Sequence, residues 1–494
     1  MDKNELYEID IEDMSEDGMG IGHVQGMAVF VKDSVVGDKA EIRIVKVKKS
    51  YAYGRVERIV EQSPFRINPV CPVARSCGGC TLQHISYEKE LELKRDRVLS
   101  CLERIGGIKA PENFLEGTFG MGLEISENEP ISNHIGQSIN DECFRYRNKM
   151  QFPVGTDRTG NVITGFYAGR THSIIPVDDC VIGNPVNKYI TDAVKTWMKT
   201  FSVKAYSEET GKGLIRHILT RAGFKTGELM VCLVVNGNKI PGSDELVRLL
   251  KAAVNLNFSL ESVVMNINKE RTNKILGDKT TLIYGREYIT DYLGDIRFQI
   301  SANSFYQVNP VQTEKLYSKA LEYAGLSGGE KVWDMYCGIG TISLFLSQKA
   351  EKVFGVEIVP QAIEDAKRNA EINGITNAEF FVGKAEEVVD RLYNSSVSEK
   401  NINSEKNEKT NEENKYHADV VVVDPPRKGC DEKLLETIHK MNPKRMVYVS
   451  CNPATLARDL KIMDEYGYRL EKFSIYDQFS RGMHVEVCCL LEQK

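Results

Sequence analysis

A succession of short, largely apolar runs, each followed by a helical pattern, constrains the fold of the last third of the chain most strongly. The runs are Lys331–Asp334, Val353–Val356, Ala418–Val423 and Met446–Val449. Continuous apolar segments of this length are typical of strands that a parallel sheet buries on both faces. Their alternation with helices predicts a doubly wound α/β domain, in which ligands bind at the carboxyl ends of the strands. We therefore expect the functional site where these runs end.

The length and the charge of the chain set further bounds. A chain of 494 residues is long enough for about three domains. The net charge of -6 means that any surface for nucleic acid must be local. No apolar stretch approaches the roughly 18 residues of a membrane helix, and the acidic start Met1–Glu5 lacks the features of a signal peptide. We therefore expect a cytoplasmic protein, monomeric for want of an evident dimer helix, whose twelve cysteines are thiols or metal ligands.

The chain divides into three predicted domains, and a polar insertion interrupts the last one. The domains are a small β-barrel at 1–62, an α+β middle domain with a cysteine-rich loop at 63–300, and the α/β domain at 301–494. The segment 394–416 is almost wholly polar and charged, cannot bury a core, and is expected to be disordered. A loop is predicted over 112–141, because these residues are rich in Gly, Glu, Ser and Asn and show weak periodicity.

Local patterns predict individual elements in the first two domains. Turn signals such as Val36–Lys39 separate three strand-like runs, Gly26–Lys32, Ala40–Val47 and Ala52–Ile59. The spacing of apolar residues predicts a helix over Tyr87–Ile105.

Two stretches combine cations with aromatic side chains. This mixture suits RNA, because cations pair with phosphates and aromatic rings stack on bases. The first stretch runs from Arg43 to Arg58 and includes Tyr51 and Tyr53 among six cations. The second, Phe144–Lys149, holds three cations and two aromatic residues. Taken alone, each stretch is explained as well by a solvated strand face.

The first strand of the α/β domain runs into a glycine turn, Asp334–Gly340, and the next strand ends at Glu357. Glycines let the backbone approach a nucleotide-like ligand, and an acid at the end of the second strand can accept both ribose hydroxyls. The third glycine of the dinucleotide fingerprint is missing, because Leu344 lies three places after Thr341. Asp334 would repel a pyrophosphate but could pair with an ammonium group. The pattern therefore favours S-adenosylmethionine over NAD as the cofactor.

A thiol and two acids follow near the ends of the later strands. Cys451 stands in Ser450–Pro453 directly after an apolar run, and Asp424 begins an Asp-Pro-Pro turn that can hold a base beside a methyl donor. Glu486 is a charged residue inside the apolar strand Met483–Leu491, which calls for a local reason. Cys451 could be a nucleophile or a small buried hydrophobe, and Glu486 could be a general base or an ion-paired edge residue.

The order of these motifs resembles that of the RNA uracil-5-methyltransferases over nearly the whole chain. The motifs are Asn303–Asn309, Asp334–Gly340, Asp424–Gly429, Ser450–Pro453 and His484–Glu486. The resemblance implies a Rossmann-like class I methyltransferase domain that uses S-adenosylmethionine. The residues that it implies for cofactor binding are Gln307, Tyr336, Glu357 and Asp424.

The resemblance also implies the roles of the thiol and of the last acid. Cys451 is the implied nucleophile, which adds to carbon 6 of uracil so that carbon 5 can attack a methyl group. Glu486 is the implied acceptor of the carbon 5 proton, and the resemblance also implies that Asp424 touches the target base. A uridine must leave its stack to reach the thiol, so the substrate should be an RNA loop or a flipped base.

The first domain resembles the TRAM module, an OB-like RNA-binding barrel. Four cysteines, Cys71, Cys77, Cys80 and Cys180, resemble the iron–sulfur site of the ribosomal RNA members. Their spacing alone suits tetrahedral zinc as well as a cubane cluster, and the resemblance favours a [4Fe-4S] cluster. We therefore expect a 23S ribosomal RNA (uracil-5-)-methyltransferase. The alternatives are a transfer RNA uracil-5-methyltransferase and a non-catalytic RNA-binding protein with a decayed methylase fold.

Overall fold

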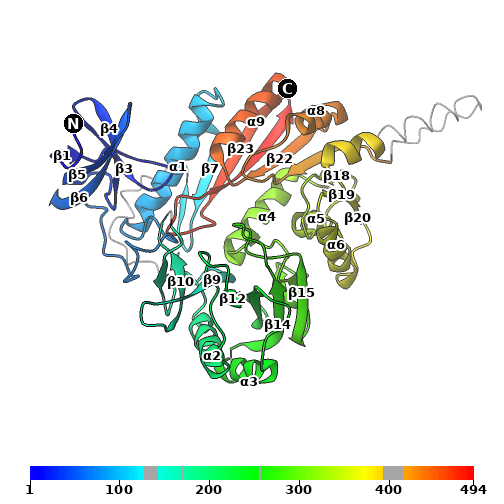
Figure 1. Cartoon of the computed structure of the whole chain (residues 1–494). Helices are drawn as coiled ribbons and strands as arrows, with labels where there is room; N and C mark the ends of the chain where they lie inside the picture. The colour runs from blue at the N-terminus through cyan, green and yellow to red at the C-terminus, as the bar shows by residue number, and fades with distance from the viewer. Residues whose placement is uncertain (127–142, 170, 255–256, 393–414) are drawn as a thin grey trace, which may run out of the picture.

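The computed structural model describes residues 1–126, 143–169, 171–254, 257–392 and 415–494. Figure 1 shows an N-terminal sheet at one side, a middle domain below, and a C-terminal domain above it. The insertion expected to be disordered at 394–416 falls outside the described residues, apart from its last two positions. Within the described ranges, no helix is long and apolar enough to cross a membrane.

The N-terminal domain is a six-stranded sheet with the order β1-β5-β6-β4-β3-β2. Its strands are β1 (Leu6–Asp10), β2 (Asp13–Met14), β3 (Gly20–Val24), β4 (Met27–Lys32), β5 (Lys39–Val47) and β6 (Tyr51–Glu61). Alternate residues of β5 point inward, and Ala40, Ile42 and Ile44 are fully buried. This alternation is typical of a sheet with one covered face. The three strands predicted from the sequence match β4, β5 and β6 to within two residues.

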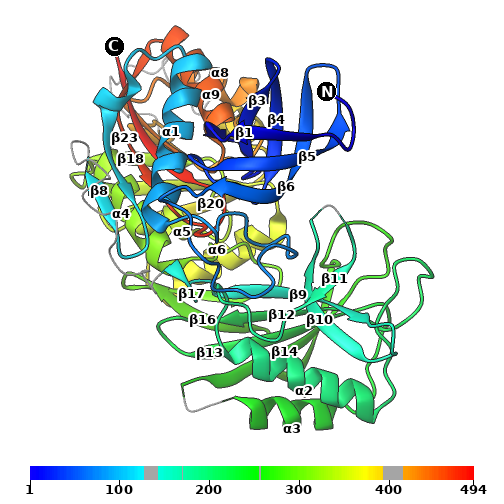
Figure 2. The ribbon, with the colours of Figure 1, turned by 90° about the vertical axis from the view of Figure 1, so that its left-hand side faces the viewer.

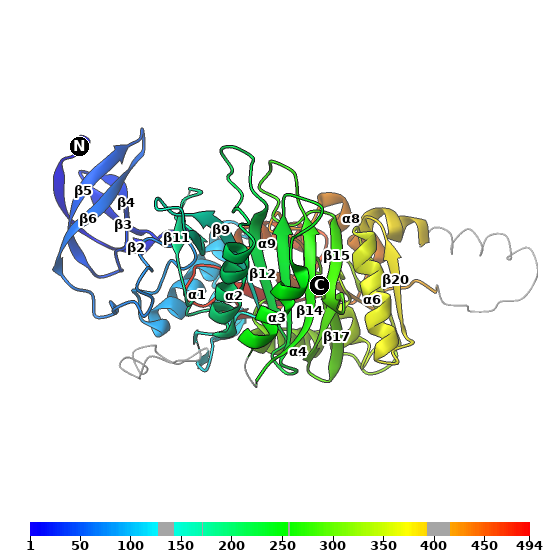
Figure 3. The same ribbon diagram turned by 60° about the horizontal axis from the view of Figure 1, so that its bottom comes forward.

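The middle domain is built on a seven-stranded sheet with the order β11-β10-β9-β12-β13-β14-β15. Its elements are β9 (Lys149–Thr156), β10 (Val162–Tyr167), β11 (Ile174–Pro176), α2 (Val186–Thr200), β12 (Ile215–Ala222), β13 (Glu228–Val235), α3 (Ser243–Ala253), β14 (Ser259–Ile267) and β15 (Lys279–Gly285). Helices α2 and α3 cover one face of this sheet (Figure 3). The predicted α+β organisation is confirmed.

The opposite face of the middle sheet packs on a hairpin and a helix that lead into the C-terminal domain. These elements are β16 (Tyr288–Leu293), β17 (Ile296–Ser301) and α4 (Pro310–Ala324). One apolar cluster contains Met230 of β13, Phe298 of β17 and Leu316 of α4. The middle and C-terminal domains therefore share a core.

The C-terminal domain is built on a nine-stranded mixed sheet with the order β20-β19-β18-β21-β22-β24-β23-β7-β8. Its strands from residue 331 onward are β18 (Lys331–Asp334), β19 (Lys352–Glu357), β20 (Ala378–Val382), β21 (Val420–Val423), β22 (Arg445–Ser450), β23 (Tyr468–Tyr476) and β24 (Glu486–Gln493). Its helices include α5 (Thr341–Leu346), α6 (Pro360–Ile372), α8 (Glu432–Met441) and α9 (Pro453–Glu465). The five strands β18 to β22 run parallel to one another, as the apolar runs predict for β18, β19, β21 and β22, whereas β24 pairs antiparallel with β22.

Part of the first half of the chain completes this sheet. Helix α1 (Tyr87–Arg104), predicted from the sequence, lies alongside α9 (Figure 2), where Val98 and Leu102 join the core of the C-terminal domain. After the short 3₁₀ helix at Pro111–Phe114, β7 (Leu115–Phe119) pairs parallel with β23, and β8 (Glu124–Ser126) pairs with β7. The loop prediction over 112–141 was therefore wrong for these strands, and residues 127–142 lie outside the described part. Both strands are short, and β23, the partner of β7, lies about 360 residues later, so local periodicity could not indicate them.

Candidate active site

The carboxyl ends of four parallel strands meet at one edge of the nine-stranded sheet. Strands β19, β18, β21 and β22 end at or directly before Glu357, Asp334, Asp424 and Cys451. The antiparallel strand β24 begins at the same edge with Glu486. The structure therefore brings together side chains that are up to 152 positions apart in the sequence, at the edge where open α/β sheets bind ligands.

The turn after β18 is shaped for a close backbone approach. Gly338 and Gly340 have φ values of +53° and +85°, in the left-handed region that glycine tolerates best. A Cβ atom on Gly338 would face open space, whereas one on Gly340 would lie 3.2 Å from the Cβ of Ala366. Tyr336, half-buried, belongs to the same turn. A ligand can therefore reach the backbone at Gly338, while Gly340 must be small for α5 to pack on α6.

Asp334 is fully buried beneath this turn. Its Oδ2 accepts a hydrogen bond of 2.6 Å from the hydroxyl of Ser343, and its Oδ1 has no hydrogen-bond partner in the described part of the chain. Burial raises the pKa of Asp334 to about 6. A buried carboxyl oxygen without a partner calls for one, and the ammonium group of a ligand would supply it.

Gln307 approaches the site from the amino end of α4, which Asn309 caps through its side chain. Gln307 is buried, and its carbonyl oxygen accepts a 2.9 Å hydrogen bond from Nδ2 of Asn148 in the middle domain. Its Oε1 lies 3.5 Å from Nε2 of Gln478, in the segment between β23 and β24. Gln307 is therefore held between the middle domain and the segment that leads to Glu486.

Cys451 occupies the turn between β22 and α9, half-buried. Asn452 caps α9 by accepting a hydrogen bond of 3.1 Å from the amide of Ala454, and Pro453 begins the helix. Proline at the first helical position has the backbone angle that a helix needs there. The register pairs Ser450 with Val487 in β24, so one further step sets Cys451 opposite Glu486.

The Asp-Pro-Pro turn after β21 is fastened to the turn that holds Cys451. The carbonyl oxygen of Arg427 accepts hydrogen bonds from Nδ2 of Asn452 at 3.1 Å and from the hydroxyl of Thr455 at 3.3 Å. Because these bonds join the two turns through backbone and cap residues, Asp424 and Cys451 keep a fixed spacing.

The carboxyl groups at this edge raise one another's pKa values and that of the thiol. Burial, followed by the charge of Asp424, raises the pKa of Glu486 well above its ordinary value. Burial, followed by Asp334, raises the pKa of Asp424 to about 7. Burial raises the pKa of Cys451 to about 12, and the charges of Glu486 and Asp424 add to this rise, whereas the charge of Arg427 lowers the pKa. A cation that enters the site therefore stabilises both the thiolate and the carboxylates.

Comparison with known proteins identifies the family. A family model described as tRNA (uracil-5-)-methyltransferase matches residues 246–494, and a TRAM domain model matches residues 3–56. An RNA methyltransferase of Halalkalibacterium halodurans is 46% identical over 494 residues, which covers 100% of this chain and 98% of that one. The chain belongs to the RNA uracil-5-methyltransferase family. This RNA methyltransferase therefore carries the TRAM module and the class of fold that its motifs predict.

Further relatives agree with this assignment. An RNA methyltransferase of Bacillus cereus is 44% identical over 493 residues, covering 100% of this chain and 98% of its own. The structure of the Pyrococcus abyssi tRNA (uracil-54, C5)-methyltransferase in complex with S-adenosyl-L-homocysteine superposes with a TM-score of 0.71 and 26% identity, covering 98% of this chain and 100% of that chain. The resemblance to the uracil-5-methyltransferases, and the dependence on S-adenosylmethionine that it implies, are supported over the whole length.

The four predicted metal ligands of this methyltransferase lie around one cavity, although Cys180 is 100 residues from Cys80 in sequence. Cys71, Cys77, Cys80 and Cys180 all line a cavity of about 200 Å³. Burial raises the pKa of Cys80 to about 12 and that of Cys180 to about 11, so the thiols hold their protons unless a cation replaces them. Among the residues that the structure describes, no group of three or more His, Cys, Asp or Glu side chains has an arrangement that could hold a metal ion. The structure therefore places the four thiols around one cavity, but it does not show the predicted iron–sulfur cluster.

Two residues next to the nucleophile position had no predicted role. The guanidinium of Arg427 lies 3.4 Å from Nε2 of His484, and the charge of Arg427 lowers the pKa values of both Cys451 and Glu486. The sequence offered one signal for Arg427, a cation directly after Asp-Pro-Pro where aminopurine methylases carry an aromatic residue. In this methyltransferase the charge of Arg427 acts on the thiol of Cys451 and on the carboxyl group of Glu486.

Proposed function

We propose that this protein transfers a methyl group from S-adenosylmethionine to carbon 5 of a uridine in 23S ribosomal RNA. The observation that carries the proposal is the position of Cys451 opposite Glu486 at the ligand-binding edge of the sheet. Cys451 is half-buried and accessible, while Glu486 is 3% exposed and its Oε2 has no hydrogen-bond partner within the described residues. A nucleophile and a base on adjacent strand ends are what covalent pyrimidine alkylation requires.

In the proposed mechanism, the Cys451 thiolate forms a bond to carbon 6 of a flipped uracil, and the electron pair of the C5–C6 double bond moves onto the ring as an enolate. S-adenosylmethionine, when bound, supplies an electrophilic methyl group on a cationic sulfur. Carbon 5 of the enolate would then form a bond to that methyl group, while the methyl–sulfur bond breaks and its electron pair stays on the sulfur of the demethylated donor, which leaves as a neutral thioether. Glu486 then takes the carbon 5 proton, the C5–C6 double bond forms again, and Cys451 leaves with the electrons of the S–C6 bond.

The surroundings of Glu486 suit the last step. A base that removes a proton near neutral pH works best when its own pKa is close to that pH. Burial raises the pKa of Glu486 well above that of an exposed glutamate, and Arg427 moderates the rise. Glu486 can therefore accept a proton at a pH at which an exposed carboxylate would be a weak base.

We assign the methyl donor to the edge between β19 and β21. Glu357 would accept the ribose hydroxyls, Tyr336 and Gln307 would flank the donor, and Asp424 would lie near the methyl group and the base. Oδ1 of Asp334, which has no hydrogen-bond partner among the described residues, would accept a hydrogen bond from the ammonium group of the donor. The open space beside Gly338 would let the donor lie against the backbone there.

We also propose that the four-cysteine cavity holds a [4Fe-4S] cluster that orders the surrounding loops. Four thiolates around one cavity suit a cubane cluster or a tetrahedral zinc ion, and the likeness of these cysteines to the iron–sulfur site of the ribosomal RNA members favours the cluster, with zinc as the weaker alternative. The cavity is lined by Arg147 and Lys149 and, among described residues, by no carboxylate. The charge of Arg147 suits a group of net negative charge, and such a group would also favour the protonated form of Lys149, whose pKa burial lowers to about 7.

Ribosomal RNA is proposed as the substrate because the TRAM module and the four cysteines occur together in this chain. A second candidate, transfer RNA, is favoured by the likeness to the Pyrococcus abyssi enzyme, whose name gives uracil-54 of tRNA as its target. A decayed, purely RNA-binding methylase fold is disfavoured by the presence of both Cys451 and Glu486.

In the test, purified protein is incubated with methyl-labelled S-adenosylmethionine. Equimolar 23S ribosomal RNA and bulk transfer RNA transcripts are present together as competing substrates. We expect labelled 5-methyluridine in the digest of the ribosomal RNA. Label in the transfer RNA alone would replace the proposed substrate, and cofactor binding without 5-methyluridine in either RNA would refute the proposed activity. The Cys451→Ala variant is the control for a covalent mechanism.

A further inference from the structure

Arg481 lies in the segment between β23 and β24, five residues before Glu486. Its side chain is only 1% exposed, although arginine is almost never fully buried without partners. Its φ is +69°, in the left-handed region that residues with a Cβ atom rarely adopt. A buried cation in an unfavourable backbone conformation persists only where the surrounding structure holds it, and such residues concentrate at functional sites.

The main chain of Arg481 is bonded to two other parts of the molecule. Its carbonyl oxygen accepts hydrogen bonds from the amides of Thr81 at 2.9 Å and Leu82 at 3.1 Å, directly after Cys80. Its amide donates a 2.7 Å hydrogen bond to Oε1 of Glu90 in α1. Residue 481 therefore ties the cysteine loop and α1 to the segment that leads into β24.

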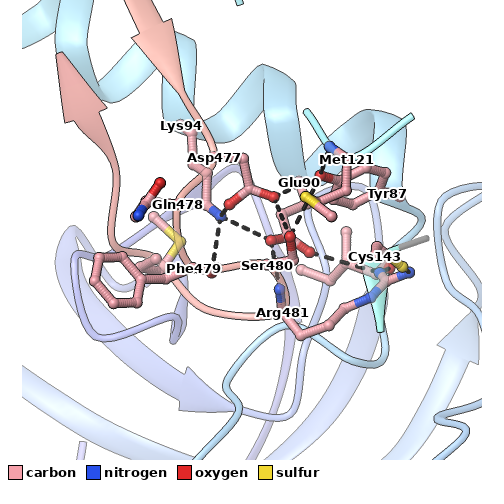
Figure 4. A network of polar contacts seen from close by, with 12 residues as sticks. Tyr87, Glu90, Lys94, Met121, Cys143, Asp477, Gln478, Phe479, Ser480 and Arg481 are labelled. Atoms are coloured by element: carbon pink, nitrogen blue, oxygen red, sulfur yellow. Dashed lines mark hydrogen bonds and ion pairs between the residues drawn. The ribbon is translucent and has the colours of Figure 1, made fainter. Parts of the chain in front are cut away.

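The side chain of Arg481 adds a third connection (Figure 4). Its two terminal nitrogens donate to the carbonyl oxygen of Ile85 at 3.1 Å and to the sulfur of Cys143 at 2.9 Å. The guanidinium also lies over the rings of Tyr87 and Phe144, 5.1 Å from each centroid. Planar contacts of this kind use the geometry of the guanidinium, which lysine cannot reproduce.

Neighbouring residues fix the same segment from both sides. Asp477 accepts hydrogen bonds from Nζ of Lys94 at 2.5 Å and from the hydroxyl of Tyr87 at 2.5 Å, and all three side chains are buried. Gln478 donates through Nε2 to the hydroxyl of Thr313 in α4 at 2.7 Å. The segment is therefore held between α1 and α4.

The connection continues from Arg481 to the active site. Met483 is buried in the same apolar cluster as Leu82, and its carbonyl oxygen accepts a 3.0 Å hydrogen bond from Arg97 of α1. His484 then contacts Arg427, and two residues later Glu486 begins β24 opposite Cys451. Every residue from 477 to 484 except Gly482 thus makes a contact that holds the strand entrance in place.

We propose that Arg481 is a positioning residue, which holds the segment 477–486 against the loop that carries Cys80 and thereby sets the place of Glu486 relative to Cys451. This inference rests on the proposed role of Glu486 as the proton acceptor. It predicts that a change in the conformation of the four-cysteine loop alters the rate of proton removal, because Thr81 and Leu82 are hydrogen-bonded to Arg481. A misplacement of about 1 Å can cost a reaction step roughly a hundredfold.

The test compares Arg481→Lys with wild type on ordinary uridine RNA and labelled methyl donor. Turnover is expected to fall at least tenfold, while protein covalently joined to methylated RNA accumulates, because methyl transfer proceeds and proton removal lags. Glu486→Gln supplies the reference for such accumulation. Arg445→Lys is the control: its guanidinium also makes several hydrogen bonds, to the carbonyl oxygens of Ala324 and Gly325 and to the carboxylate of Glu492, but it is 38% exposed and lies at the end of β22 away from Cys451. It should leave turnover unchanged and accumulate no adduct.

A second variant, Cys143→Ala, removes one partner of the guanidinium and leaves Arg481 in place. We expect it to accumulate the adduct to a smaller extent than Arg481→Lys. If both variants lose turnover and adduct together, or if both keep full turnover, Arg481 has no positioning role. If wild type makes neither 5-methyluridine nor adduct, it is the proposed function that fails.

Discussion

Lys94 carries the strongest prediction about stability. Its side chain is 0% exposed and pairs with Glu90 at 2.8 Å and with Asp477 at 2.5 Å, both also 0% exposed. Burial lowers the pKa of Lys94, but Asp477 and Glu90 together raise it above its ordinary value, so the lysine stays charged at neutral pH. In Lys94→Met the two carboxylates would stay buried, and the cation that remains paired with one of them among the described residues is Arg481, 3.5 Å from Glu90.

The expected cost follows from this arrangement. Breaking a buried ion pair by removing one partner destabilises by about 3–5 kcal/mol, because the remaining charge is not compensated. The chain contains a matched control. Lys440 of α8 pairs with Glu436, also four residues earlier and also at 2.8 Å, but these side chains are 64% and 51% exposed. Lys440→Met should therefore have no measurable effect.

Hydrogen exchange suits the measurement, because a chain of several domains need not unfold in one step. Peptides from α1 and from 477–486 should exchange roughly 10²- to 4 × 10³-fold faster in Lys94→Met, since about 1.4 kcal/mol corresponds to a factor of ten. Peptides of α8 should be unchanged in Lys440→Met. Equal exchange rates in the two variants would refute the reasoning that the buried network fixes this segment.

Three further predictions concern the site itself. Glu486→Gln should lower turnover about 10²- to 10⁴-fold and accumulate an RNA adduct on Cys451, visible on denaturing gels, because the thiolate cannot leave before the proton does; unchanged turnover would exclude Glu486 as the base. The pKa of Asp424 is raised to about 7, so stability should fall as pH rises from about 4 to 7, where the unfolded chain ionises first. Thermal melts of Asp424→Asn should lack this pH-dependent loss of stability, which we expect to be roughly 1 kcal/mol because Asp424 is partly exposed. The same dependence of stability on pH in Asp424→Asn and wild type would contradict the raised pKa of Asp424. Gly340→Val should weaken S-adenosylmethionine binding about tenfold by calorimetry, because a Cβ atom there sits 3.2 Å from Ala366 at a φ of +85°, and wild-type affinity would argue against the rigid turn.

The sequence predicts well which residues meet at the carboxyl edge of the sheet, because the signals there are local. Each apolar run ends at the residue that faces the site, so Glu357, Asp424 and Cys451 could be placed at one edge from the parallel-sheet rule alone. Glu486 could be singled out as a charge inside an apolar strand, and the structure confirms its burial. The register that sets it opposite Cys451 depends on an antiparallel strand order that periodicity does not report.

Contacts between distant segments could not be predicted from the same sequence. Strand β7 completes the sheet by pairing with β23, and its short run carries no pattern that names a partner. Lys94 and Asp477 are 383 residues apart, and from the sequence a lysine in a helix rich in charged residues is expected to be solvated. Arg481 gives no local sign of its left-handed backbone, because neither its neighbours nor its type favour that conformation. The roles of Lys94 and Arg481 can be recognised only from the structure, in which α1, the cysteine loop and the segment 477–486 are in contact.

The most direct measurement of the central claim uses RNA with 5-fluorouridine at the target position, S-adenosylmethionine and wild-type protein. Fluorine replaces the proton that Glu486 would remove, so the reaction should stop as a methylated adduct, with mass spectrometry locating the nucleotide on the peptide that contains Cys451. The Cys451→Ala variant should give no adduct. Full 5-methyluridine formation by Cys451→Ser on ordinary RNA, or an adduct on any other cysteine, would contradict the account.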